Sequence, residues 1–113
     1  MSMQGVLANR VFRAVADPTR RKILDRLREH ELSVGELQAG FRISQPAISR
    51  HLNVLRNARL VQRRRDGRSN VYRLNAQPMS AVVDWMSHYA AFWESRLVNL
   101  GALLDEDKEG GSR

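Results

Sequence analysis

Residues 33–52 read SVGELQAGFRISQPAISRHL and contain the start signals of two consecutive helices. Ser33 stands three residues before Glu36, a spacing typical of the capping box at the start of a helix. Ser44 begins a second helix, because serine is a favoured N-cap and Pro46 falls in the first turn, where backbone N–H groups have no acceptor within the helix. Two short helices with such a brief connection predict a helix-turn-helix.

The second of these helices has two different faces. Ile48, Leu52 and Leu55 follow one another at intervals of four and three residues, so they lie on one side of a helix and predict its buried face. A helix of this size fits the major groove of B-DNA, where arginine pairs with guanine and asparagine or glutamine pairs with adenine. An ordinary solvated surface helix is the alternative interpretation. The polar side chains that would read bases are Gln45, Ser49, Arg50 and Asn53.

A β-hairpin is predicted directly after the second helix. Asp66-Gly67 indicates a two-residue turn, because glycine accepts a positive φ, and Val61 and Tyr72 supply apolar anchors on the two strands. A helix-turn-helix followed by a two-stranded ribbon is a winged helix. We expect the arginines of this wing to bind phosphates or the minor groove, and to supply affinity more than sequence choice. These wing arginines are Arg63, Arg64, Arg65 and Arg68.

The positive charge of the chain is concentrated around this hairpin. The whole chain has a formal net charge of +7, and residues 56–73 hold seven arginines and one aspartate. Residues 74–113, in contrast, hold three basic and six acidic residues. A charge localised in this way indicates an anion-binding surface. A solvated basic face that keeps the protein soluble is the alternative.

Further helices are predicted before and after this region. Asp17-Pro18 marks a helix start, with aspartate as N-cap and proline at the first helical position, and a preceding helix spans roughly residues 6–16. After Pro78 a long helix is predicted, because apolar residues step by alternating intervals of four and three. This heptad-like seam is typical of a helix that packs along a partner helix for its full length. Its members are Met86, Ala90, Trp93, Leu97, Leu100 and Leu104.

Several kinds of function are excluded or disfavoured by what the sequence lacks. There is no cysteine, so disulfides and thiolate metal sites are ruled out. There is no glycine-rich phosphate loop and no local Ser-His-Asp signature, so we predict no enzymatic activity and no cofactor. The richest apolar stretch, residues 81–93, contains Asp84 and His88 and is too short to span a bilayer, which predicts a soluble protein that does not enter a membrane. A cytoplasmic location is expected, because a chain without cysteine suits a reducing compartment.

Two features of the last predicted helix leave other interpretations open. Asp84 and His88 stand four residues apart and would share a metal ion if a second copy completed the site. A surface pair that stabilises the helix is the favoured interpretation, so we predict no metal site. A cluster of aromatic residues would line a small-molecule pocket, although packing at an interface is favoured. This cluster consists of Trp85, Tyr89, Phe92 and Trp93.

Four segments, in this order, resemble the ArsR/SmtB family of bacterial winged-helix repressors: DPTRRKIL, ELSVGEL, SQPAISRHLNVLRNARLV and RRRDGRSNVYRL. With the long terminal helix, the resemblance covers about Val11 to Leu104. It implies a mainly α fold with a small β-hairpin wing, and a homodimer built by the first and last helices. It also implies a sequence-specific transcriptional repressor that binds an imperfect palindrome in double-stranded DNA. Residues 1–104 would form one domain, and residues 105–113, which have no apolar residue, a disordered tail.

The resemblance also implies roles for individual positions. The first helix would add Leu7 and Val11 to the dimer interface formed by the seam. Ser44 and Asn53 complete the set of residues on the second helix that we expect to contact DNA. The residues that match the groove-reading and wing positions of the family are Gln45, Pro46, Ser49, Arg50, Arg64, Arg65 and Arg68.

The chain departs from the metal-sensing members of this family. Those members often carry Cys-x-Cys where this chain reads Ser33-Val34-Gly35, and an Asp-x-His motif where this chain has Asp84-x-x-x-His88. The chain therefore resembles more closely the cysteine-free branch that lacks the usual metal-sensing motifs, and the sequence identifies no small-molecule inducer. A ligand- or metal-gated sensor and a winged helix that binds protein are the alternatives to a DNA-binding repressor.

Overall fold

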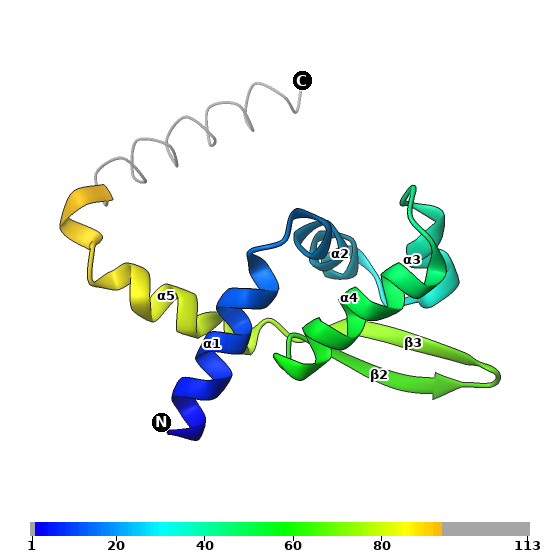
Figure 1. The fold of residues 1–113 in the computed structure, drawn as a ribbon, viewed down its shortest axis with the longest axis horizontal. Helices are drawn as coiled ribbons and strands as arrows, with labels where there is room; N and C mark the ends of the chain where they lie inside the picture. The colour runs from blue at the N-terminus through cyan, green and yellow to red at the C-terminus, as the bar shows by residue number, and fades with distance from the viewer. Residues whose placement is uncertain (1, 94–113) are drawn as a thin grey trace, which may run out of the picture. The chain divides into compact units, whose positions relative to one another are not determined.

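The computed structural model describes residues 2–93. In the part up to Val82, helices lie on one side of a small antiparallel sheet, and the hairpin of this sheet projects away from them (Figure 1). The described part of the chain divides into two compact units, with the boundary between Val82 and Val83. The architecture confirms the prediction of a mainly helical fold with a β-hairpin wing. In chain order the elements are α1 (Met3–Val15), α2 (Pro18–Glu29), β1 (Leu32–Ser33), α3 (Val34–Ala39), α4 (Gln45–Asn57), β2 (Val61–Asp66), β3 (Ser69–Leu74), the 3-10 helix η1 (Gln77–Met79) and α5 (Ser80–Ser87).

The N-terminal caps of α3 and α4 form as the sequence predicts. The Ser33 hydroxyl accepts a hydrogen bond from the Glu36 N–H at 3.2 Å, and the Glu36 carboxylate accepts one from the Ser33 N–H at 2.9 Å. This capping box satisfies two backbone donors at the start of α3. The Ser44 hydroxyl accepts the Ala47 N–H at 3.3 Å. Pro46 lies in the first turn of α4, so it removes no helical hydrogen bond.

Two arginines of α2 close the C-terminal end of α1. Arg20 Nε donates to Ala14 O at 2.8 Å, and Arg20 Nη2 donates to Arg13 O at 2.9 Å. Arg21 Nη1 donates to Val15 O at 2.8 Å. These carbonyls belong to the last turn of α1, where the usual donor four residues later is missing, although Arg13 O also accepts the Ala16 N–H at 3.3 Å. The two side chains therefore satisfy them and fix the corner between α1 and α2.

The N-cap of α2 contributes stability that depends on pH. Asp17 Oδ2 accepts the Arg20 N–H at 3.0 Å, and this hydrogen bond lowers the pKa of the Asp17 carboxyl below its ordinary value of 3.8. Because the folded pKa is depressed, the contribution is fully present above the ordinary value. It is lost as the pH falls through the folded pKa.

We expect Asp17→Ala to lower the free energy of unfolding by about 0.5–2 kcal/mol near neutral pH. Asp17→Ser retains a capping oxygen, so this matched control should recover most of the loss. Urea unfolding at a series of pH values measures both variants. The deficit of the alanine variant should shrink in acid, because the wild-type carboxylate then becomes protonated. A deficit that is equal at every pH would contradict the role given to Asp17.

The core of the first unit lies between the helices and one face of the sheet. Ile48, Leu52 and Leu55 of α4 are all 0% exposed, which confirms the predicted buried face of this helix. Full burial of an aliphatic side chain of this size contributes about 1.5–3 kcal/mol relative to exposure. The other buried residues are Val11, Ala14, Ile23, Leu24, Leu27, Leu37, Ala58, Leu60, Val61 and Tyr72.

The sheet has three strands in the order β1-β3-β2, one more than the predicted two-stranded ribbon. In β1, Leu32 pairs with Tyr72 and Ser33 pairs with Val71. A strand of only two residues is too short to show the alternation of apolar and polar residues from which a strand is predicted. Ser33 also caps α3, so the local pattern indicates only the start of a helix. The pairing of β1 with β3 leaves β2 as an outer strand.

The hairpin turn lies one residue later than the sequence predicts. Asp66 still pairs with Ser69, so the two turn residues are Gly67 and Arg68. Gly67 has a φ of +60° and Arg68 does not have a positive φ. Glycine at the first of the two positions is the pattern of a type II′ turn, which matches the twist of the flanking strands. The shift places Arg68 at the tip of the hairpin.

α4 ends in a Schellman motif that has an arginine where glycine is usual. The Leu60 N–H donates to Leu55 O and the Arg59 N–H donates to Arg56 O, both at 2.9 Å. Arg59 has a φ of 62°, a left-handed conformation that costs a non-glycine residue on the order of 1 kcal/mol. The Asn75 side-chain amide donates to Arg59 O at 2.8 Å and supports this conformation.

The terminal helix is interrupted after Ser87, so the prediction of one continuous helix from residue 80 onward is wrong. The N–H groups of His88 and Tyr89 donate to carbonyls three residues earlier, Trp85 O at 3.2 Å and Met86 O at 2.9 Å. The Ser87 hydroxyl donates to the carbonyl three residues before it at 2.6 Å. Side-chain hydrogen bonds of this kind compete with those of the helix backbone. The result is a turn at residues 88–89.

Residues 90–93 are helical again. None of the helices formed by residues 2–93 has both the length and the apolar character needed to cross a bilayer.

Candidate nucleic-acid interface

One polar surface of α4, which we name the reading face, consists of Gln45, Ser49, Arg50 and Asn53. Ser49 is partly buried and the other three are exposed. None of the four side chains forms a hydrogen bond or ion pair with another residue of the described chain. Their donors and acceptors are therefore all available to a ligand. Ser44 and Pro46, at the start of the same helix, are also exposed.

Another side of α4 is anchored by a polar contact. His51 Nδ1 lies 3.3 Å from Arg20 Nη1 and 3.9 Å from Asp17 Oδ2. The same Arg20 guanidinium closes the end of α1, so this one side chain connects α1, α2 and α4. The contacts that hold α4 in place thus leave the reading face free.

Two neighbouring arginines of the wing lie on opposite faces of the sheet. Side chains alternate along a strand, so Arg63 shares a face with its partner Tyr72, whereas Arg64 points to the other face. Arg64 Nη2 lies 2.9 Å from Glu31 Oε2, and this hydrogen-bonded ion pair raises the pKa of the Arg64 guanidinium. The charge of Arg64 is therefore balanced within the chain. The exposed side chain of Arg63 makes no hydrogen bond or ion pair within residues 2–93.

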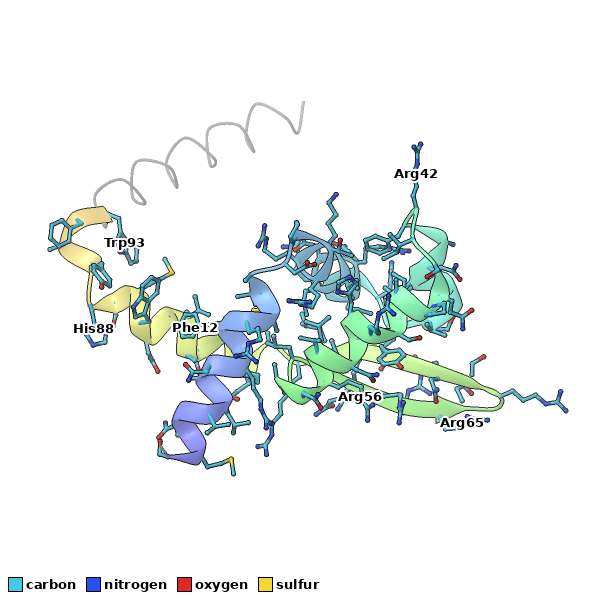
Figure 2. The ribbon with its side chains drawn as sticks, in the orientation of Figure 1. Phe12, Arg42, Arg56, Arg65, His88 and Trp93 are labelled. Carbon is cyan, nitrogen blue, oxygen red and sulfur yellow. The ribbon has the colours of Figure 1, made fainter. Side chains whose placement is uncertain are left out.

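The other two wing arginines lie near the tip of the hairpin. Arg65 Nε donates to Gly67 O at 3.0 Å, so this side chain folds back over the turn. Arg68 is exposed and makes no side-chain hydrogen bond within the described residues. Figure 2 shows Arg65 on the hairpin and Arg42 projecting from the loop between α3 and α4. The structure thus brings the four predicted wing arginines onto one hairpin but gives them unequal surroundings.

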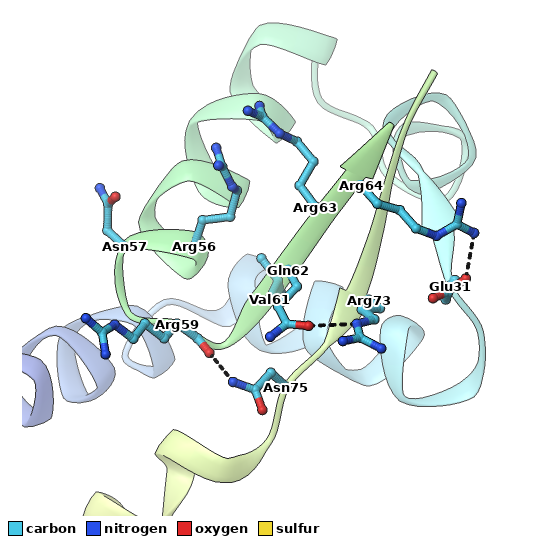
Figure 3. A pocket seen from close by; sticks show the side chains of 10 residues that line it. All are labelled: Glu31, Arg56, Asn57, Arg59, Val61, Gln62, Arg63, Arg64, Arg73 and Asn75. Atoms are coloured by element: carbon cyan, nitrogen blue, oxygen red, sulfur yellow. Dashed lines mark hydrogen bonds and ion pairs between the residues drawn. The ribbon is translucent and has the colours of Figure 1, made fainter. Parts of the chain in front are cut away.

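A cleft of about 830 Å³ opens between the end of α4 and the outer strand β2 (Figure 3). Arg59 and Arg73 line this cleft, although no sequence motif assigned them a role. The signal that would have indicated them is the high density of arginine in residues 56–73. Glu31 is the one acidic residue that lines the cleft. The arginines that line it are Arg56, Arg59, Arg63, Arg64 and Arg73.

The residues expected at a dimer interface have different surroundings. Val11 is 1% exposed and belongs to the core of the single chain, so its side chain offers almost no surface to a second copy. Leu7, Ala90 and Trp93 are partly buried, and Met86 is 37% exposed. The seam residues that lie outside the described part of the chain are Leu97, Leu100 and Leu104.

Large aromatic side chains are exposed on the second unit. Phe92 is 79% exposed, Trp85 is 53% exposed and Tyr89 is 48% exposed. The rings of Trp85 and Tyr89 meet edge to face, with centroids 5.4 Å apart and an interplanar angle of 63°. A concentration of exposed aromatic side chains in a short segment indicates an interaction surface.

The pair that suggested a metal site, Asp84 and His88, has no third ligand in the described part of the chain. Nowhere in residues 2–93 do three His, Asp or Glu side chains come together. His88 Nδ1 lies 3.1 Å from Trp85 O, so one ring nitrogen already has a neighbour with which it can bond. A structural zinc ion takes four ligands, and this pair supplies two of them.

Known proteins that are similar to this chain are described as transcriptional regulators. The model of the family described as bacterial regulatory protein, arsR family, matches residues 17–63, which run from the N-cap of α2 into β2. The transcriptional repressor SdpR of Bacillus subtilis is 41% identical over 81 residues, which cover 72% of this chain and 90% of that protein. The HTH-type transcriptional regulator Rv2034 of Mycobacterium tuberculosis is 38% identical over 99 residues, which cover 88% of this chain and 90% of that protein.

A solved structure extends the likeness to three dimensions. The crystal structure of an ArsR family transcriptional regulator, RHA00566, superposes on this chain with a TM-score of 0.72 at 30% sequence identity. The superposition covers 84% of this chain and 98% of the other. The similarity therefore extends well beyond the helix-turn-helix itself.

Proposed function

Because this chain belongs to the ArsR/SmtB family of bacterial regulatory proteins, we propose that it is a repressor that binds a palindromic operator in double-stranded DNA as a homodimer. Proteins of this family are transcriptional regulators and not enzymes, which confirms the expectation that the chain is not an enzyme. A regulator that acts on bacterial DNA works in the cytoplasm, so we propose that location as well.

The observation that carries this proposal is the contrast between two faces of α4. Ile48, Leu52 and Leu55 are fully buried and hold the helix in place, while the reading face is open and has no partner among the described residues. Arginine, asparagine, glutamine and serine side chains supply the donors and acceptors that pair with base edges in the major groove. A rigidly held helix with such a face is suited to sequence-specific recognition.

The proposed homodimer is supported by the exposed apolar surface of the second unit. Trp85, Met86, Tyr89 and Phe92 present large apolar side chains, and burial of such side chains against a second copy is favourable. A two-fold dimer would present two reading faces to half-sites about 34 Å apart, which is one helical turn of DNA. The relative SdpR, which is named a transcriptional repressor, supports repression as the outcome of binding.

Selection of bound sequences from random duplex DNA tests this function. We expect the wild-type protein to enrich one motif with two-fold symmetry, because two identical reading faces recognise the same bases on opposite strands. Enrichment of an asymmetric single site would contradict the homodimer. The absence of any enriched motif would contradict sequence-specific binding and would favour a winged helix that binds protein.

Phe92→Asp is expected to convert the dimer to a monomer, because it places a charge on an apolar surface that the second copy has to cover. Ser80→Asp adds the same charge at the exposed start of α5, so this control should stay dimeric. Sedimentation of the two variants and the wild type at equal concentrations measures their molar masses. A dimeric Phe92→Asp variant would place the interface elsewhere on the protein.

A further inference from the structure

The cleft between α4 and β2 has a strong excess of positive charge. Arg64 Nη2 lies 2.9 Å from Glu31 Oε2, and Arg73 Nε donates to Gln62 Oε1 at 2.7 Å, so both of these arginines already have partners. The remaining arginines of the cleft form no side-chain hydrogen bond or ion pair within the described chain. Unpaired like charges around one cleft repel one another, and an anion bound among them would relieve this repulsion. The unpaired arginines are Arg56, Arg59 and Arg63.

The cleft continues the reading face of α4. Arg56 follows Asn53 by three residues and Ser49 by seven, so these three residues lie on the same side of the helix. Arg63 approaches from β2, on the face of the sheet that it shares with Tyr72. Figure 3 shows the Arg56 and Arg63 side chains extending in the same general direction, from α4 and from β2. The opening of the cleft therefore lies beside the C-terminal half of α4, at the base of the wing.

Arg59 occupies a backbone position that favours glycine. Its φ of 62° ends α4 in a left-handed conformation, which glycine adopts without strain. The Asn75 amide bonds to the Arg59 carbonyl at 2.8 Å, but no described residue bonds to the Arg59 guanidinium. Strained backbone positions of this kind cluster at functional sites. An arginine that is unfavourable for folding and has a free guanidinium is explained if that group binds a ligand.

We propose that Arg56, Arg59 and Arg63 bind backbone phosphates of the DNA whose bases α4 reads. A guanidinium group pairs with phosphate oxygens through two parallel N–H···O bonds, which suits it to this ligand. The proposal rests on the proposed DNA-binding function and adds a phosphate site next to the reading face, at the base of the wing. Arg64 has a structural role instead, because its ion pair with Glu31 connects β2 to the residue before β1.

The salt dependence of DNA binding tests the site. Arg56→Ala and Arg63→Ala should each reduce the slope of log affinity against log potassium chloride concentration by about one unit, as expected for the loss of one phosphate contact. Arg64→Ala should reduce the slope less than Arg63→Ala, although the two residues are neighbours. Arg28→Ala, on the exposed side of α2, is the control that should leave the slope unchanged. Unchanged slopes for Arg56→Ala and Arg63→Ala, or a larger loss for Arg64→Ala, would overturn the proposal.

Arg59→Gly separates binding from folding. Glycine relieves the positive φ, so the variant should melt at or above the wild-type temperature. Its affinity for DNA should nevertheless fall, and its salt slope should decrease by about one unit. If Arg59 served only to end α4, the variant would bind DNA as the wild type does, and that result would overturn the assignment of Arg59.

Two further measurements distinguish this proposal from the proposed function and from a site for free phosphate. If the variants reduce the salt slope on random duplex DNA but no operator can be selected, the phosphate site stands and sequence-specific repression fails. If an operator is selected but no slope changes, the phosphate site fails and the proposed function stands. The melting temperatures of the wild type and the variants in potassium phosphate and in potassium chloride, at equal ionic strength, show whether the cleft binds free phosphate. If phosphate raises the melting temperature of the wild type but not of the variants, and the salt slopes of the variants on DNA are unchanged, the assignment of the cleft to DNA phosphates is overturned.

Discussion

Leu52→Ala is expected to lower the free energy of unfolding by about 2–5 kcal/mol, because truncation of a fully buried leucine leaves a cavity in the core. Leu52 is 0% exposed and lies between Ile48 and Leu55 on the buried face of α4. A domain of this size is stable by about 5–15 kcal/mol, so the substitution removes a large part of its stability. The cavity also loosens the attachment of α4, so the affinity for DNA should fall together with stability.

Urea unfolding measures this loss, and two variants provide controls. Asn53→Ala alters the exposed neighbour and should change the free energy of unfolding by less than about 0.5 kcal/mol. Leu52→Met preserves most of the side-chain volume and should cost less than about 1.5 kcal/mol. A Leu52→Ala variant as stable as Asn53→Ala would show that the apolar face does not hold α4 in place.

Arg50→Ala is expected to weaken binding to the selected operator by about 1–3 kcal/mol for each half-site, which is roughly a 5- to 150-fold loss of affinity per half-site. Arg50 is exposed on the reading face and has no partner in the described chain, so its guanidinium can pair with the O6 and N7 acceptors of a guanine. The affinity should be lost through a single base pair in each half-site, the one that Arg50 contacts. Binding to random DNA should change much less.

Arg50→Lys is the matched control, because lysine keeps the charge but lacks the planar pair of donors. This variant should retain the wild-type salt slope and still lose discrimination at the same base pair. Titration of labelled operators that carry single base-pair changes measures both properties. Equal weakening of operator and random DNA by Arg50→Ala would mean that Arg50 contacts a phosphate instead of a base.

Much of the fold follows from signals that act over a few residues. Ser33 and Glu36 bond to each other's backbone, so the capping-box pattern and the observed hydrogen bonds involve the same atoms. The spacing of Ile48, Leu52 and Leu55 describes one side of a helix, and that side is the one buried. The same spacing leaves Ser49, Arg50 and Asn53 on other sides of the helix, where they form most of the open reading face.

The features that the sequence did not indicate depend on residues distant in the chain. Arg64 and Glu31 are separated by 33 residues, and nothing in the run of arginines distinguishes Arg64 from Arg63. The strand β1 forms because β3 lies beside it, which no local pattern of two residues can show. The left-handed Arg59 was missed because glycine is the usual signal for such a helix end.

The interruption of the terminal helix has a different cause. The spacing of the heptad-like seam depends on apolar positions alone, and it predicts an unbroken helix through Met86 and Ala90. The hydrogen bonds of the polar side chains between these positions interrupt the helix instead. Ser87 bonds to the carbonyl three residues before it, and the His88 ring lies beside the Trp85 carbonyl. Both contacts favour a turn at this point.

Substitution of single purines by their 7-deaza analogues in the selected operator tests most directly that α4 reads bases in the major groove. The analogue removes the N7 acceptor from the major groove and leaves base pairing and the minor groove intact. The wild-type protein is expected to lose affinity at symmetric positions in two half-sites whose centres lie about 34 Å apart. Arg50→Ala should be insensitive to the substitution at one of these positions. Full affinity for every 7-deaza operator, with losses only when inosine removes the minor-groove amino group of guanine, would contradict major-groove reading by α4.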